Sequence, residues 1–163
     1  MNVEIVEERR PELVKYIEIT RQSAEFIKQQ LKESSFQLEY VHNMFKNCDK
    51  DNIYVYDAYL ITNGKKIHVG TALVFYTYDK KAYLGIIVVH YLYRGLGIGT
   101  RIVQEIIRRA KERGIREICA EVLTDEEYQL MDINTNEMMV RRFFEKNGFK
   151  LKDEYLYCYE IMT

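Results

Sequence analysis

The sequence predicts a single α+β domain, and three observations lead to this prediction. The chain has 163 residues, which is enough for one sizeable core and short for two. Its apolar residues follow a helical spacing before residue 48 and strand-like runs after residue 52. A glycine-rich loop then joins a strand to a clearly amphipathic helix, and a further helix and closing strands follow. No internal repeat or low-complexity tract is visible.

The composition is that of an ordinary globular protein. Hydrophobic residues make up 47% of the chain and charged residues 30%. The net charge of -1 predicts no general affinity for nucleic acid. A mean hydropathy of -0.34, without any long uncharged apolar run, predicts no membrane span. Residues 1–11 are charged and do not resemble a signal peptide, so we expect a cytoplasmic protein.

The cysteines and histidines do not predict a metal site. Cys48, Cys119 and Cys158 lie far apart and form no Cys-x-x-Cys pair. The last two lie in apolar strand-like runs, so we expect buried thiols there. The three histidines also lack metal-ligand spacing; they are His42, His68 and His90.

The first third of the chain is predicted to be mostly helical. Residues 3–6 alternate weakly and are compatible with a short strand. Pro11 is suited to the first position of a helix, and apolar residues then recur at helical spacing as far as Leu31. A second helix is predicted to end near Asn47.

A three-stranded meander follows. Residues 53–61 and 67–78 are rich in strand-forming residues, and Asn63-Gly64 between them is a strong hairpin signal. Residues 79–81 turn the chain into a third strand, residues 82–89. The end of that strand is apolar on both faces, which predicts a central, buried position.

The remaining elements alternate between helix and strand. Residues 98–110 carry an apolar stripe, and Gly114 is a natural helix stop. Residues 115–123 are predicted as a strand, and residues 124–135 as an acidic irregular segment or a short helix. Asn134 is predicted to cap a helix that runs to Lys146, with Glu137 completing a capping box. Residues 149–162 supply one or two closing strands.

The segment with the clearest chemical meaning is the loop between the third strand and the helix. Three glycines alternate there, which allows successive backbone N–H groups to face a common point. The helix start adds unpaired donors and the positive end of its dipole, so the loop predicts a diphosphate cradle. A Walker loop is excluded because no lysine is present. A dinucleotide fingerprint is excluded because Ile102 stands where it needs a third glycine.

Two motifs resemble those of the GCN5-related N-acetyltransferase (GNAT) superfamily. Arg94-Gly95-Leu96-Gly97-Ile98-Gly99 is similar to the family's Arg/Gln-x-x-Gly-x-Gly/Ala acetyl-coenzyme A loop. Phe143-Phe144-Glu145-Lys146-Asn147-Gly148-Phe149 resembles its Leu/Phe-Tyr-x-x-x-Gly-Phe. The order of elements from residue 53 onward also matches. The resemblance implies a mixed central sheet with splayed strands and flanking helices, and acetyl-CoA as co-substrate.

The resemblance also implies a set of coenzyme contacts. The loop N–H groups would hold the diphosphate, and the end of the preceding strand would pair with the pantetheine arm. A free N–H there would polarise the thioester carbonyl. The expected coenzyme-binding residues are Val88, Val89, Arg94, Gly95, Leu96, Gly97, Ile98, Gly99, Thr100 and Asn136. Between residues 94 and 116, seven basic and two acidic residues give a local net charge of +5. Some of these charges are expected to meet phosphates, and most to form a solvated helix face with Glu105 and Arg109 paired.

The catalytic residues depart from the family pattern. Phe144 stands where the family often has a tyrosine acid, so the acid is moved, supplied by water or absent. The tyrosines that are candidates to replace it are Tyr128, Tyr155, Tyr157 and Tyr159. A frequent position of the base falls at Tyr83, which is a poor base at neutral pH. Glu121, inside an apolar strand, is the candidate base, and a solvent-facing structural carboxylate is the alternative.

These observations give one functional prediction and two alternatives. We expect one acetyltransferase-like domain over residues 1–163, with a helical part at 1–48, the meander and coenzyme unit at 53–123 and a closing part at 134–163. It would move an acetyl group from acetyl-CoA to a primary amine by direct transfer in a ternary complex, with the early helices walling the acceptor pocket. The expected partner is an amine substrate, and no nucleic acid, membrane or metal is expected. A homodimer is one of the oligomeric states that the sequence leaves open. The alternatives are a non-catalytic acyl-CoA sensor or interaction domain and an unrelated nucleotide binder.

Overall fold

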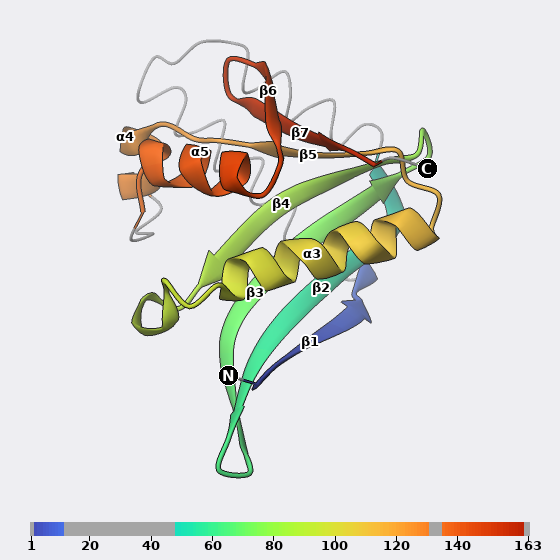
Figure 1. Cartoon of the computed structure of the whole chain (residues 1–163). Coiled ribbons are helices and arrows are strands. Elements are labelled where there is room, and N and C mark those ends of the chain that lie inside the picture. The colour runs from blue at the N-terminus through green and yellow to red at the C-terminus, as the bar shows by residue number, and fades with distance from the viewer. Residues whose placement is uncertain (1, 12–47, 131–134, 162–163) are drawn as a thin grey trace.

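The computed structural model describes residues 2–11, 48–130 and 135–161 of the chain (Figure 1). The helices predicted before residue 48 fall outside the described residues, apart from their first position at Pro11. The strands are β1 Asn2–Arg9, β2 Cys48–Thr62, β3 Lys65–Thr77, β4 Lys81–Val89, β5 Glu117–Glu121, β6 Lys150–Asp153 and β7 Leu156–Glu160. The helices are η2 Tyr91–Tyr93, α3 Ile98–Glu112, α4 Asp125–Leu130 and α5 Glu137–Lys146.

The described strands form one seven-stranded sheet in the order β1-β2-β3-β4-β5-β7-β6. Neighbouring strands are antiparallel except β4 and β5, which are parallel. Parallel neighbours need a crossover connection, and the loop with α3 supplies it. The prediction of a mixed sheet with flanking helices in an α+β fold is confirmed.

The turns that join β2, β3 and β4 have the backbone conformations that the sequence predicts. Asn63 and Gly64 have φ values of 49° and 75°, which suits the tight β2–β3 hairpin. Lys80 also has a positive φ, 62°, in the β3–β4 turn. At the far end of α3, Gly114 adopts φ 73° directly after the helix, as its predicted role as a stop requires.

The helix α3 packs its apolar stripe on one face of the sheet, with α5 on the same face (Figure 1). The buried residues of α3 are Ile98, Ile102, Val103, Ile106 and Ala110. Because side chains alternate along a strand, the same strands supply a second cluster on the opposite face. That cluster comprises Ile53, Leu73, Phe75, Tyr83, Cys119 and Cys158.

The prediction of buried thiols at Cys119 and Cys158 is wrong in one respect. Both residues are buried, but they form a disulfide with a Cα–Cα distance of 4.1 Å. They are direct partners in the β5–β7 register. The two residues are 39 positions apart in sequence, and only the antiparallel pairing of β5 with β7 brings them together.

The N-cap of α5 also differs from the prediction. The helix begins at Glu137, and the Asn136 side chain accepts a hydrogen bond from Met139 N at 2.9 Å. Asn134, the predicted cap, lies outside the described residues. A cap side chain bonds the N–H group two or three residues ahead, and this spacing selects Asn136 as the cap for a helix that begins at Glu137.

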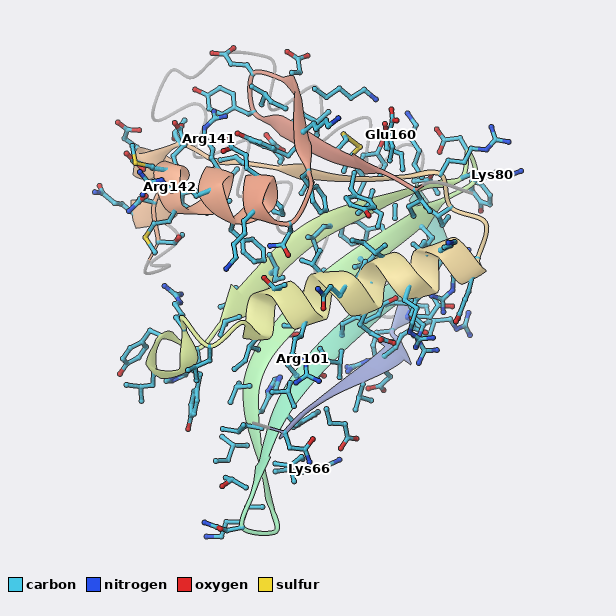
Figure 2. All side chains as sticks on the ribbon, viewed as in Figure 1. Lys66, Lys80, Arg101, Arg141, Arg142 and Glu160 are labelled. Atoms are coloured by element: carbon cyan, nitrogen blue, oxygen red, sulfur yellow. A yellow bond between two sulfur atoms is a disulfide. The ribbon has the colours of Figure 1, made fainter. Side chains whose placement is uncertain are left out.

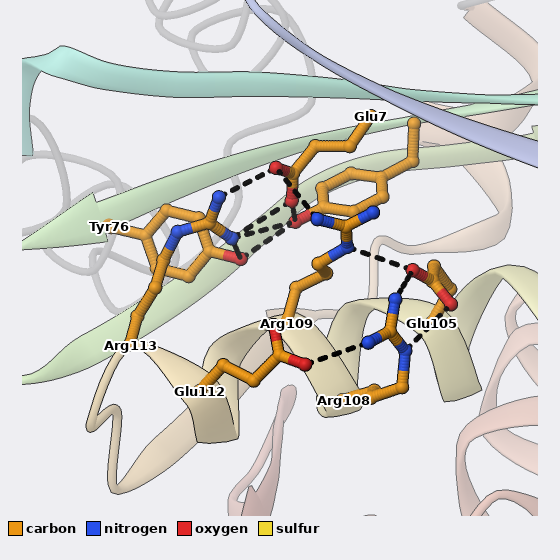
Figure 3. Close-up of polar contacts among 8 residues, drawn as sticks. Glu7, Tyr76, Glu105, Arg108, Arg109, Glu112 and Arg113 are labelled. Atoms are coloured by element: carbon orange, nitrogen blue, oxygen red, sulfur yellow. Dashed lines mark hydrogen bonds and ion pairs between the residues drawn. The ribbon is translucent and has the colours of Figure 1, made fainter.

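A partly buried polar network ties β1 to the end of α3 (Figure 3). Both carboxylate oxygens of Glu7 accept hydrogen bonds from Arg113, at 2.6 and 2.8 Å. Tyr56 also donates to Glu7, and its hydroxyl lies 2.8 Å from that of Tyr76. Burial alone would raise the pKa of Glu7, but the hydrogen bonds from Arg113 and Tyr56 and the charges of Arg113 and Arg109 outweigh it and hold the pKa below 4.5.

We expect Glu7→Gln to lower the free energy of unfolding by about 2–3 kcal/mol at neutral pH, because charge-assisted hydrogen bonds are lost. The pKa of Glu7 is depressed in the folded state, so its contribution is complete above the ordinary value of 4.5 and lost as the pH falls through the folded value. Urea unfolding at several pH values measures this. The gap between wild type and variant should therefore narrow in acid. The control is Glu4→Gln, on the same strand as Glu7, which removes an exposed ion pair with Lys66 of β3 and should change the free energy of unfolding little. An equal effect of both changes would contradict the assignment.

Candidate functional site

The candidate site begins where β4 and β5 part. The two strands pair only from Lys81–Glu117 to Leu84–Ala120. Beyond that point β4 continues to Val89, paired on its other edge with β3. The β5 edge of this last part of β4 therefore has no neighbouring strand among the described residues, and Figure 1 shows the two strands diverging. The prediction of splayed strands is confirmed.

A bulge at Gly85 marks the parting point. Leu73 pairs with Ile86 and Val74 with Leu84, so Gly85 has no partner on β3. A Cβ at Gly85 would lie 2.6 Å from Cε2 of the buried Phe75 ring. The strand pattern around Gly85 predicts no special position for it, and the one local signal is that an isolated glycine within a strand is typical of a bulge.

The tail of β4 is less buried than the sequence predicts. Ile87, Val88 and Val89 are each half-buried, although β4 is the central strand of the sheet. The departure of β5 explains this, because it removes the neighbour that would have covered one edge. Val88 and Val89, two of the predicted coenzyme contacts, therefore border the open gap.

Arg94 fastens the loop to the end of the strand. Its Nε donates a hydrogen bond to the Val89 carbonyl oxygen at 2.9 Å. His90 N donates to Val69 O at 2.8 Å, which anchors the loop to β3, and the exposed His90 ring stacks on Tyr91. The sequence predicted Arg94 as a positive charge for a phosphate. In the structure, its hydrogen bond to Val89 holds the loop against the end of β4.

The three loop glycines have two different functions. Gly95 and Gly97 have φ values of 80° and 79°, and no atom lies within 4 Å of a Cβ built on either. Such a Cβ would occupy the space a ligand needs to approach the backbone. Gly99 is helical instead, and its Cβ would lie 3.1 Å from the Phe143 ring. The absence of a Cβ at Gly99 therefore lets α3 approach α5, while its N–H, in the first turn of α3, stays a predicted diphosphate contact.

The helix start completes the cradle. The first hydrogen bond of α3 runs from Arg101 N to Gly97 O, at 3.1 Å. Residues 98–100 precede it, so their N–H groups have no acceptor within the helix and lie at its positive end. This donor set fits a diphosphate, and the two open glycines let it approach.

Most basic residues of α3 serve the protein itself. Glu105 pairs with Arg109 at 2.9 Å, as predicted, and with Arg108. Arg113 binds Glu7 (Figure 3). Arg101, which is labelled in Figure 2, donates to the Val3 carbonyl oxygen at 3.2 Å. The predicted Glu105–Arg109 pair is confirmed, and the other basic residues named here also have acceptors within the protein.

Glu121 lies at the mouth of the gap. It is the last residue of β5, one position beyond the last β4–β5 pair, and thus level with Gly85 in the parallel register. Strand alternation places it on the same face as Cys119 and Tyr83. The residue is half-buried, and its Oε1 is shielded from solvent. Tyr83 is buried, and burial together with the charges of Asp79 and Glu117 raises its pKa, which agrees with the view that it is a poor base.

Phe144 is a core residue. It is 3% exposed and packs against Phe149 and Tyr157. It offers no proton donor at the position where the resemblance implies one. Asn136, the remaining predicted coenzyme contact, is exposed at the start of α5 and uses its side-chain oxygen as the cap.

A family model for the acetyltransferase (GNAT) family matches residues 18–149. The chain belongs to the GNAT family. Among curated proteins, no sequence matches the chain significantly. The fold match covers nearly the whole chain in several solved structures. A GNAT acetyltransferase from Staphylococcus aureus Mu50 is 20% identical, with 99% of this chain and 100% of that one covered and a TM-score of 0.57.

A second solved structure is the PaiA N-acetyltransferase from Thermoplasma acidophilum in complex with coenzyme A. It is 17% identical, with 98% of this chain and 99% of that one covered and a TM-score of 0.56. At these identities the likeness establishes the GNAT fold. No described helix is both long and apolar enough to cross a membrane.

Glu117, Cys119 and Cys158 place one potential metal-ligand atom each within 4.8 Å of one another. The two sulfurs are bonded to each other, and Glu117 pairs with Lys152 at 3.0 Å. Because these partners already use the ligand atoms, the cluster gives no support for a metal site in this GNAT domain.

We expect Gly85→Ala to weaken both the fold and the site. The added Cβ must push the Phe75 ring or the bulge, and overpacking of this kind costs about 1–3 kcal/mol. Thermal unfolding and coenzyme titration measure the two effects. Phe75→Leu in the same chain should relieve the clash and restore part of the loss. No rescue by Phe75→Leu would show that contact with this ring is not the reason for Gly85.

Proposed function

We propose that the chain transfers the acetyl group of acetyl-CoA to a primary amine, directly and within a ternary complex. As a member of the GNAT family it uses acetyl-CoA as co-substrate. The observation that carries the proposal is the combination of a gap between β4 and β5 with a donor-lined cradle at its outer end. The extended pantetheine arm of acetyl-CoA would reach from such a cradle to the point where β4 and β5 part, and would place the thioester there.

The proposed coenzyme contacts follow from this geometry. The backbone of Gly95, Leu96 and Gly97 and the first turn of α3, Ile98 to Thr100, would hold the diphosphate. Arg94 keeps the loop against Val89 and adds positive charge. The open edge of β4 at Val88 and Val89 would pair with the pantetheine arm as an added strand does. Asn136, exposed at the start of α5, is the least supported contact.

The reaction needs the amine to lose a proton and the thiolate to gain one. The amine nitrogen attacks the thioester carbonyl carbon, and a β4 N–H near the bulge stabilises the oxygen as charge develops there. Glu121 is the proposed base, either directly or through one water. Its support is its place level with Gly85, where the thioester would end. Collapse of the tetrahedral species then breaks the C–S bond and forms the amide.

The acceptor is a primary amine of a small molecule, a lysine side chain or a protein N-terminus. The segment proposed to wall its pocket is residues 11–47, which lies outside the described residues apart from Pro11. We place the amine on the face of the sheet opposite α3 and α5, which is the face where Glu121 lies. A cytoplasmic location, the absence of nucleic-acid and membrane partners, and a homodimer remain predictions.

The burial of Phe144 favours one alternative of a different class. A GNAT domain that has phenylalanine at the family's acid position is compatible with an acyl-CoA sensor or interaction domain that does not turn over. A domain that only binds acyl-CoA would need the same cradle and the same gap as an enzyme. Turnover therefore separates the two functions.

Two measurements test the proposal. Thermal shift with coenzyme A, acetyl-CoA, ATP and NAD should show stabilisation by the first two alone. A panel of a diamine, an aminoglycoside, an N-acetylated lysine peptide and a peptide with a free N-terminus should then release thiol with at least one acceptor. Binding of coenzyme A without transfer to any amine favours the sensor. Stabilisation by ATP or NAD alone would support the unrelated nucleotide binder.

A further inference from the structure

A short polar row crosses the sheet on the face opposite α3. Asp57 of β2 pairs with Thr71 of β3, and Thr71 pairs with Val88 of β4. Side chains of directly paired residues lie on the same face, so these three are neighbours. Val88 borders the gap between β4 and β5. The row therefore runs from the gap to Asp57 over two strand spacings, which is about 10 Å.

The part of this face next to the polar row is apolar. Toward the end where β4 and β5 are joined, the next two rows pair Val55 with Leu73 and Ile53 with Phe75. All four residues belong to the second core cluster or pack against it. The polar row is half-buried at the border of this apolar floor. A carboxylate in such a place is less screened by water, which strengthens its attraction for a cation.

A bulge in β3 brings a histidine to the same face. Ala58 pairs with Gly70 and Tyr59 with His68, so Val69 has no partner on β2. A Cβ built on Gly70 would lie 3.1 Å from a side chain of α3, and Val69 belongs to the core cluster that α3 covers. Two successive residues therefore face α3. The bulge restores the alternation one residue later and places His68 on the opposite face.

His68 holds the carboxylate of Asp57 in one orientation. Its Nε2 lies 2.9 Å from Asp57 Oδ1, and its ring lies against the Tyr59 ring, with 5.2 Å between the ring centres. No hydrogen bond among the described residues reaches the second oxygen, Oδ2. The Asp57 side chain is 22% exposed, so the carboxylate is accessible from this face.

The distance to the reacting centre indicates what Asp57 could bind. In the proposed reaction the attacking amine lies on this face, near Glu121 and level with Gly85. From there, Asp57 is two strand spacings across the sheet and one row along it, on the order of 12 Å. A group that binds Asp57 would therefore belong to the far end of the acceptor molecule.

We propose that Asp57 selects acceptors that carry a second cationic group about 12 Å from the acetylated amine. This inference rests on the proposed function. The distal ammonium would donate charge-assisted hydrogen bonds to Asp57, with the Thr71 hydroxyl as a further acceptor. The distal group does not react, so it binds equally in the ground state and in the transition state. Its binding therefore lowers KM and leaves kcat unchanged.

The test compares two acceptors of one length. An extended eight-carbon α,ω-diamine is about as long as the proposed separation, and the eight-carbon amino alcohol replaces its distal ammonium by a hydroxyl. The wild-type kcat/KM should favour the diamine by about 10–100-fold, as charge-assisted hydrogen bonds predict, with the difference in KM. A three-carbon diamine cannot reach Asp57 and should have no such advantage over its own amino alcohol.

Asp57→Asn should bring the ratio of the two eight-carbon acceptors close to one. Asparagine keeps the size of the side chain and an acceptor for His68, so the melting temperature, the Kd for acetyl-CoA and the kcat/KM for the amino alcohol should stay near wild type. Glu4→Gln, on the same face and paired with Lys66, is the control and should keep the wild-type ratio. Asp57→Lys should reverse the preference toward an eight-carbon amino acid, whose distal group is a carboxylate. A structural role of Asp57 would not produce this reversal.

The outcomes separate this inference from the proposed function. A wild-type protein that acetylates any amine of the panel but does not prefer the long diamine to the amino alcohol would overturn the inference alone. The wild-type preference in Asp57→Asn would overturn it as well. Binding of acetyl-CoA without acetylation of any amine would contradict the proposed function itself, and the inference with it.

Discussion

Gly97→Val is expected to remove coenzyme binding while the domain stays folded. The valine side chain would fill the open space in front of the loop backbone, where the diphosphate approaches. Losing two charge-assisted hydrogen bonds costs about 3–6 kcal/mol, which is an affinity loss of about 10²–10⁴-fold. Calorimetric titration with coenzyme A measures it directly.

The matched control for this change is Gly114→Val. Gly114 has φ 73° and, like Gly97, no atom within 4 Å of a built Cβ, but it lies at the other end of α3. Both variants force valine into the left-handed region and should lose similar stability. Only Gly97→Val should lose coenzyme affinity. If both variants bind coenzyme A as the wild type does, the diphosphate does not approach at Gly97.

Glu121→Gln is expected to lower turnover by about 10²–10⁴-fold, the usual loss when a general base is removed. Glutamine keeps the size of the side chain, so the melting temperature and acetyl-CoA binding should be preserved. The loss should be most visible at lower pH, where more of the amine is protonated. Initial rates of thiol release across roughly pH 6–9 give the measurement.

Glu117→Gln is the control for Glu121→Gln. Glu117 lies on the same strand and the same face, but at the end where β4 and β5 are joined, and it pairs with Lys152. Its replacement should leave turnover close to wild type. Near wild-type turnover by Glu121→Gln would make Glu121 a structural residue. Catalysis would then rest on positioning and the N–H groups of β4, with water carrying the proton.

The sequence predicts well those features that short-range rules determine. The hairpin at Asn63-Gly64 and the apolar stripe and stop of α3 follow from local patterns. The resemblance of two motifs to those of the family then suffices to predict the mixed sheet and the splayed strands. The two motifs lie close together, because a Cβ built on Gly99 would lie 3.1 Å from the Phe143 ring.

Features that depend on strand register are outside the reach of local patterns. The Cys119–Cys158 disulfide requires β5 and β7 to be neighbours, and the bulge at Gly85 is defined by its pairing with β3.

The position of bound acetyl-CoA tests the central claim most directly, and a crystal structure of the complex measures it. We expect the diphosphate on the N–H groups of the loop from Gly95 to Thr100, and the thioester between the β4 tail and the end of β5, near Gly85 and Glu121. A coenzyme bound with its diphosphate away from this loop, or with its thioester outside the gap, would contradict the account.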